Sequence, residues 1–140
     1  MPLMVILIEE LPMGSRKKKQ YNNGAFKSVP VKVLNSDSYK GLGYSARALL
    51  MELTLQYNGY NNGKLCAIHN QLEERGFKSG CTVTAAIKEL LDAKLIALSK
   101  LNYKGSRKPN YYALTWESVD HISDFKMDIA DTVRPLRWFH

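Results

Sequence analysis

The clearest periodic pattern in the chain follows Ser45. A helical face is predicted by apolar residues at three- and four-residue spacing, with Ser45 as the N-cap. Asn-Gly steps in "NGYNNG" (residues 58–63) end this amphipathic helix, and residues 64–66 follow as a very short strand. The apolar stripe consists of Ala46, Leu49, Leu50, Leu53 and Tyr57.

Two further helical patterns come next. A short helix over about residues 67–75 is predicted, with Ile68 and Leu72 inward, Gly76 beyond its C-terminus and Phe77 in the core. Ser79 then caps a third helix that extends to residue 94. Its apolar face consists of Val83, Ala86, Ile87, Leu90 and Leu91, and its opposite face of Cys81, Ala85, Lys88 and Asp92.

After residue 94 the pattern becomes extended. Residues 95–101 ("LIALSKL") and 110–116 ("NYYALTW") predict two strands of a hairpin around the polar loop "NYKGSRKP". Alternation places Tyr111 and Tyr112 on opposite faces, so one of them belongs to the core. The loop carries Lys104, Arg107 and Lys108, with Lys100 a few residues earlier.

The N-terminal region has weaker signals. Residues 3–8 ("LMVILI") predict a strand, because the stretch is too short for a membrane span and lacks the features of a signal peptide. The four cations of residues 16–19 form either a solvated loop or an arm along a phosphate backbone. Residues 29–34 ("VPVKVL") predict another short strand, in which Pro30 favours an edge position or the strand start.

Composition and charge restrict the function. The 140 residues suit one domain with extensions, and the net charge of +7 favours a polyanionic partner. Cys66 and Cys81 stand apart without clustered histidines, which argues against structural zinc and favours reduced thiols in the cytoplasm. We expect no cofactor and no membrane association.

Three helices followed by a basic hairpin indicate an α+β fold of the winged helix-turn-helix type. We expect an N-terminal strand and basic arm (1–38), a winged-helix domain (39–120) and a C-terminal extension (121–140). Small residues in the first turn would let helix 79–94 enter the major groove of double-stranded DNA, with the wing, residues 99–110, on the backbone. The expected DNA-binding residues are Lys78, Ser79, Cys81, Thr82, Thr84, Lys88, Lys100, Lys104, Arg107 and Lys108.

The stretches "SARALLMELTLQYNGYNNGKL", "LEERGFKSGCTVTAAIKELLDAKLI" and "GSRKPNYYALTW" resemble small bacterial winged helix-turn-helix DNA-binding proteins of phage-like or plasmid-like elements. They are also similar to the DNA-binding domains of replication initiators and of MarR-like or GntR-like regulators. The resemblance covers roughly residues 39–120. It implies a transcriptional regulator, or a replication-associated binder of a mobile element, with the same helix and loop residues against DNA.

Other function classes have less support. Cys66 and His69 could form a Cys–His nucleophile, but no third orienting group is apparent. "GLG" at residues 41–43 lacks the lysine of a phosphate-binding loop, and neither His121 nor His140 belongs to a catalytic motif, so we expect no enzymatic activity. A protein-interaction module, in which the loop cations are incidental, is the alternative. Residues 3–8 and the aromatic pair at residues 138–139 either form a homodimer interface or complete the monomer core.

Overall fold

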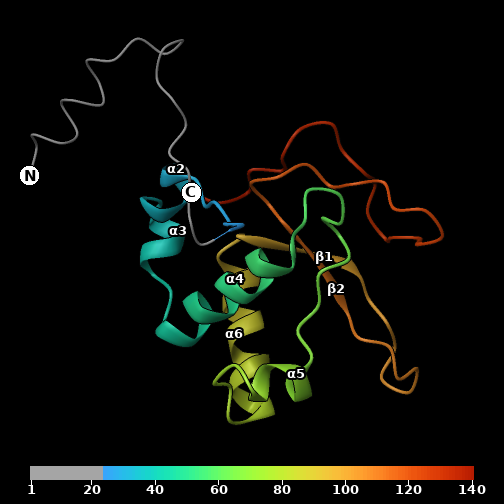
Figure 1. Ribbon diagram of the computed structural model, residues 1–140, viewed down its shortest axis with the longest axis horizontal. Coiled ribbons are helices and arrows are strands. Elements are labelled where there is room, and N and C mark those ends of the chain that lie inside the picture. Colours follow the sequence, from blue (N-terminus) through green and yellow to red (C-terminus); the bar gives the residue numbers. More distant parts are fainter. Residues whose placement is uncertain (1–23) are drawn as a thin grey trace, which may run out of the picture.

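The computed structural model describes residues 24–140, so the strand predicted at residues 3–8 and the cations of residues 16–19 lie outside the described residues. The described chain combines five helices with a two-stranded antiparallel sheet, an α+β fold (Figure 1). The elements are α2 (Val31–Leu34), α3 (Asp37–Lys40), α4 (Tyr44–Gln56), α5 (His69–Glu73), α6 (Gly80–Asp92), β1 (Ile96–Lys100) and β2 (Tyr111–Leu114).

The α4 helix confirms the predicted apolar stripe and corrects its start. Its stripe residues 46, 49, 50 and 53 are buried against α6, beside which α4 lies in Figure 1. The N-cap is Gly43 and not Ser45, which is exposed within the first turn. The Gly43 N–H donates to Glu89 Oε2 of α6 at 2.5 Å. A carboxylate from another helix therefore replaces the expected serine cap, where it also faces the positive end of the α4 dipole.

The α5 and α6 helices follow the predicted pattern, although α5 is shorter than expected. Leu72 is buried, Ile68 is half-buried, and Phe77 is only 5% exposed. Gly76 has a φ of 103°, a left-handed conformation that glycine adopts without steric cost. The Ser79 hydroxyl caps α6 by accepting from the Thr82 N–H at 3.2 Å, as predicted.

The predicted hairpin is also present. Tyr112 is buried and Tyr111 is half-buried, so one tyrosine belongs to the core as expected, although residues 112–114 are all buried and burial does not alternate along β2. The strand predicted at residues 64–66 is reduced to one bridge, in which Leu65 and Tyr112 exchange backbone hydrogen bonds of 3.2 and 2.7 Å. The register pairs Ile96 with Leu114, Ala97 with Ala113, Leu98 with Tyr112 and, after an irregularity, Lys100 with Tyr111.

The strand predicted at residues 29–34 is wrong, because this segment forms the helical turn α2. The Pro30 carbonyl accepts from the N–H groups of Val33 and Leu34, so the backbone is satisfied locally and not by a neighbouring strand. Val33 is fully buried, whereas Val31 is 70% exposed. One buried contact of a single helical turn therefore overrides the β preference of the valines.

Asn62 joins the turn after α4 to the chain after β2. It is fully buried, and its side-chain nitrogen donates to the carbonyls of Leu114, Glu117 and Ser118 at 3.0, 3.2 and 2.9 Å. Its side-chain oxygen accepts from the Leu114 N–H at 2.7 Å. The second Asn-Gly step therefore does more than form a turn, since it ties together segments more than fifty positions apart.

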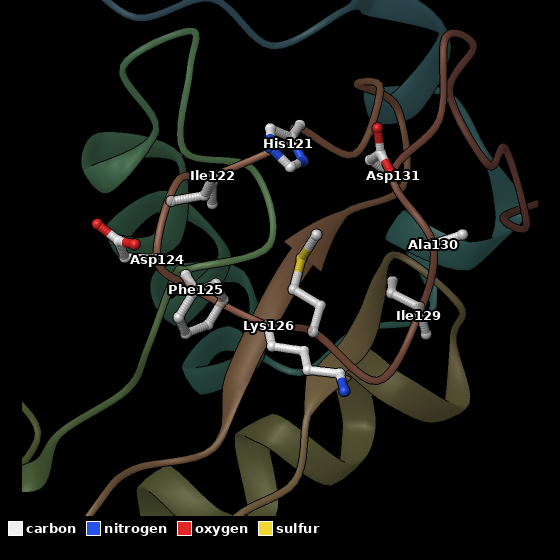
Figure 2. Close-up of a pocket in the computed structure, with 9 residues that line it drawn as sticks. His121, Ile122, Asp124, Phe125, Lys126, Ile129, Ala130 and Asp131 are labelled. Carbon is white, nitrogen blue, oxygen red and sulfur yellow. The ribbon is translucent and has the colours of Figure 1, made fainter.

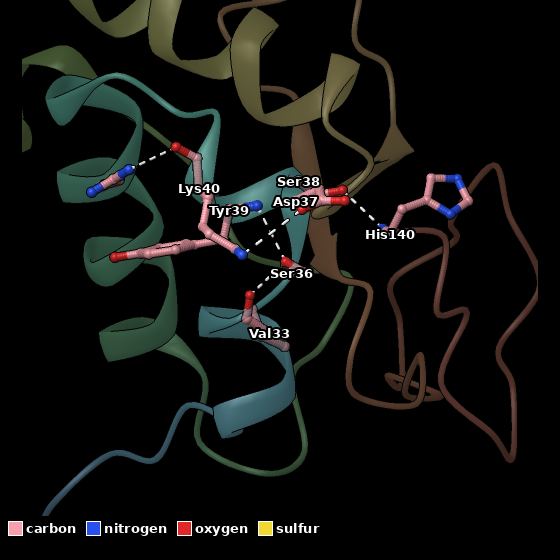
Figure 3. A network of polar contacts seen from close by, with 8 residues as sticks. Val33, Ser36, Asp37, Ser38, Tyr39, Lys40 and His140 are labelled. Carbon is pink, nitrogen blue, oxygen red and sulfur yellow. Dashed lines mark hydrogen bonds and ion pairs between the residues drawn. The ribbon is translucent and has the colours of Figure 1, made fainter.

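The C-terminal segment, residues 117–140, contains no helix or regular strand but is attached to the domain by backbone hydrogen bonds. At its end the Ser38 N–H donates to the His140 carbonyl at 2.8 Å. The His140 N–H donates to Ser38 Oγ, also at 2.8 Å (Figure 3). Phe139 packs against the core and Trp138 is 43% exposed. Other anchors are Asp120 N–H to Asn62 O, Asp128 N–H to Ser99 O, and Arg137 N–H to Thr115 O.

Candidate nucleic-acid interface

The first turn of α6 presents small, uncharged side chains to solvent. Ser79, Cys81 and Thr84 are exposed and Thr82 is half-buried, and this turn contains no acidic residue. Ser79 Oγ and Thr82 Oγ1 share one hydrogen bond of 2.9 Å, so one hydroxyl proton of the pair remains able to donate. Thr84 Oγ1 donates to the Gly80 carbonyl at 3.0 Å and retains its acceptor capacity.

The charged residues of α6 lie further along the helix. Lys88 is exposed and forms an ion pair of 2.9 Å with Asp92, one turn away. Exposed pairs of this type contribute only about 0.3–0.5 kcal/mol, so a phosphate can take the place of the aspartate. The Glu89 carboxylate is held by the Gly43 N–H at the start of α4. Both carboxylates of this helical face therefore have partners within the protein.

A groove of about 390 Å³ runs between the start of α4 and the outer face of α6. It is lined by Cys81, Thr82 and Ala85 from the first two turns of α6. Across the groove, Tyr44 is exposed and lies 6.0 Å from the Arg47 guanidinium. The expected recognition helix therefore borders a depression whose α6 wall consists of small side chains in its first two turns and of the Glu89 carboxylate further along.

The hairpin loop, residues 101–110, is held by its own polar side chains. Asn102 donates from its amide to the Pro109 carbonyl at 2.7 Å, and its N–H donates to Asn110 Oδ1 at 2.8 Å. Ser106 Oγ donates to the Tyr103 carbonyl at 2.8 Å, and the turn continues through a left-handed residue 107. These contacts leave the predicted cations Lys104, Arg107 and Lys108 exposed, with no ion pair to any described carboxylate.

Lys100 does not extend toward this loop. Its Nζ donates to the Lys126 carbonyl at 2.7 Å and lies 5.3 Å from the centre of the Phe125 ring. Lys64 lies 5.1 Å from the same ring centre. Sequence reasoning did not identify Lys64, Lys126 or Phe125 as functional residues, because they lie far from the hairpin along the chain and carry no local motif.

The two groups of predicted residues lie toward the same end of the molecule. In Figure 1 the N-terminal end of α6 and the hairpin loop are both at the bottom of the view, with α5 between them. Lys78, in the connection before α6, is exposed at this end. The start of α6 and the hairpin loop therefore lie toward one end of the molecule, on either side of α5. Lys100 lines a pocket with Lys64 and Lys126, and Lys108 of the loop also borders this pocket.

The remaining chemistry of the described chain is limited. Burial raises the pKa of the half-buried Cys66 thiol, whereas Cys81 is exposed. Within residues 24–140, no three His, Cys, Asp or Glu side chains gather as metal ligands would. No helix of this part of the chain has the length and apolar character needed to cross a membrane. Comparison with protein-family models, curated proteins and solved structures found no match.

Proposed function

We propose that this protein binds double-stranded DNA as a winged helix-turn-helix protein. In this proposal α6 enters the major groove and the hairpin loop contacts the adjacent phosphate backbone. The observation that carries the proposal is that the acid-free first turn of α6 and the hairpin loop lie toward the same end of the molecule (Figure 1), while the loop cations form no ion pair with a carboxylate of residues 24–140. The resemblance of residues 39–120 to bacterial regulators makes transcriptional regulation the biological role that we propose.

The side chains of α6 suit this role in size and chemistry. The major groove is about 12 Å wide, so a helix with serine, cysteine and threonine on its leading edge can approach the base edges closely. The Thr84 hydroxyl already donates its proton to the Gly80 carbonyl. Its oxygen can therefore act only as an acceptor toward DNA, for example from a base amino group. Lys78 and Lys88 are exposed at positions that can reach phosphate or guanine.

The hairpin loop suits phosphate contacts. Lys104, Arg107 and Lys108 are exposed, and the net charge of +7 attracts a polyanion over a longer range. Contacts of this kind fix the position of a protein on DNA and contribute little to sequence selection. We therefore assign selection to α6 and salt-dependent affinity to the loop.

Salt-dependent DNA binding tests the loop assignment. Each phosphate contact contributes about 0.9 to the slope of log K against log salt, so K104Q/R107Q/K108Q should lower its magnitude by up to about 2.7. The corresponding loss of affinity at about 0.1 M salt is up to roughly 500-fold. The control K32Q/K40Q/K94Q removes the same charge from exposed positions elsewhere and should retain most of the slope. Equal slopes of log K against log salt for the two variants would refute the assignment of phosphate contacts to the hairpin loop.

The α6 assignment has its own test. Ala85 is exposed on the outer face of α6, and A85E adds a carboxylate there without removing a buried contact. We expect A85E to abolish specific duplex binding, whereas A130E, the same change at an exposed position of the C-terminal segment, should bind like the wild type. A wild-type chain with no duplex affinity at about 0.1 M salt and a specific protein partner would establish the interaction-module alternative instead.

A further inference from the structure

A lysine-rich pocket of about 260 Å³ lies between the hairpin and the C-terminal segment. Four lysines line it, and they come from separate parts of the chain: Lys64 before α5, Lys100 at the end of β1, Lys108 in the hairpin loop and Lys126 in the C-terminal segment. Folding therefore concentrates positive charge at one place. The Lys100 side chain extends toward this pocket, where its Nζ donates to the Lys126 carbonyl.

The aromatic ring of Phe125 organises two of these cations. The ammonium groups of Lys64 and Lys100 lie 5.1 and 5.3 Å from its ring centre, within the range of cation–π attraction. Tyr111 of β2 contacts the ring edge-on, with centres 4.9 Å apart and planes at 81°. Figure 2 shows Phe125 next to Lys126 on the loop formed by residues 121–131. Contacts from the sheet and from this loop thus fix the position of the ring in the pocket wall.

The positive charge of the pocket is not balanced by the protein. Asp124 is the single carboxylate among the residues that line it. None of the four lysines forms an ion pair with a carboxylate in the part of the chain that the structure describes. The carboxylate of Asp128, which follows in the same loop, accepts instead from the Leu101 N–H at 2.8 Å. Like charges gathered in this way repel one another, and a bound anion relieves the repulsion.

We propose that this pocket binds a phosphate group. Lysine ammonium groups act as point charges toward phosphate and offer three donors each, of which Lys100 uses one within the protein. The phosphate has two sources, either the backbone of DNA held by the hairpin loop, which rests on the proposed function, or a free phosphate compound. Lys108 belongs to both the loop and the pocket, so a strand following the loop would pass the pocket entrance.

The test uses the full chain and two probes, a duplex measured by fluorescence anisotropy and inorganic pyrophosphate measured by titration calorimetry. The K64Q/K126Q variant removes two pocket cations and leaves the proposed loop residues in place. K32Q/K94Q is the control with the same charge change at exposed positions. A third variant, D124N, removes the pocket carboxylate and keeps a residue type that tolerates the left-handed φ of 60° at this position.

If the pocket holds a backbone phosphate, the slope of log K against log salt for duplex binding should be smaller in magnitude by about 0.9 in K64Q/K126Q than in the control. Its duplex affinity at about 0.1 M salt should be about eightfold weaker than that of the control. A free phosphate compound predicts weaker pyrophosphate binding with unchanged duplex binding. In both cases D124N should bind the respective probe several-fold more tightly, a gain that misfolding cannot produce.

The proposal is overturned if K64Q/K126Q matches K32Q/K94Q with both probes. This result leaves the proposed function intact where the loop variant still loses duplex affinity. Conversely, a wild-type chain that binds pyrophosphate through Lys64 and Lys126 but binds no duplex would retain the pocket and refute the DNA-binding function.

Discussion

Replacement of Asn62 by alanine should destabilise the fold more than any exposed substitution. The side chain is fully buried; its two amide protons are shared among three carbonyls, and its oxygen accepts from the Leu114 N–H, which amounts to about three hydrogen bonds. A net value of about 1 kcal/mol per bond, together with the cost of leaving the buried Leu114 N–H unpaired, gives a loss of roughly 3–5 kcal/mol. Small domains have only about 5–15 kcal/mol of total stability, so this loss is large.

Urea unfolding followed by far-ultraviolet circular dichroism measures this loss. N70A is the matched control, because Asn70 is exposed and its side chain makes no hydrogen bond within the described chain, so its change should stay within about 0.5 kcal/mol. N62D keeps the acceptor for Leu114 but turns a carboxylate toward carbonyl oxygens, so it should be at least as harmful as N62A. A loss below about 1 kcal/mol for N62A would refute the role of Asn62 as the tie between these segments.

Three further predictions concern the thiols, a carboxyl group and the chain end. Iodoacetamide at pH 8, followed by peptide mass spectrometry, should label the exposed Cys81 before Cys66, whose pKa is raised by burial. Burial, and next the charge of Asp120, raise the pKa of Glu117 above its ordinary value, so its ionised form costs stability at neutral pH. E117Q should therefore raise Tm at pH 7, with a gain that shrinks as pH falls through the raised pKa and the ordinary carboxyl range. Deletion of residues 139–140 should lower the unfolding free energy by roughly 1–3 kcal/mol in urea, because two hydrogen bonds and an apolar contact are lost.

The periodicity of apolar residues was sufficient to predict the elements that bury one continuous face. The leucines of α4 and the apolar face of α6 each repeat several times, so the prediction did not depend on any one residue. In β2 the residues 112–114 are all buried, so strict alternation does not hold there. The segment at residues 29–34 has too few residues to distinguish a strand from a helical turn. The burial of Val33 decided its structure, and this depends on contacts that the local sequence does not encode.

The candidate site could be predicted only in part, because the local sequence does not encode contacts between distant segments. The cap of α6 by Ser79 and the exposed loop cations follow from local rules about helix starts and polar turns. The pairing of Lys88 with Asp92 also follows helical spacing. By contrast, the direction of Lys100 depends on Phe125 and Lys126, which reach the hairpin only after the C-terminal segment folds back across it. Contacts of this kind between distant segments produce no periodic pattern in the sequence.

The pairing of Ser38 with His140 sets the exit direction of anything fused to this chain. In Figure 1 the C-terminus lies beside α2, toward the end of the molecule away from the hairpin loop. A fluorophore or affinity handle attached after a short flexible spacer would therefore project away from the proposed DNA side. Immobilisation through that point would leave both α6 and the hairpin loop accessible to a duplex in the bulk solution.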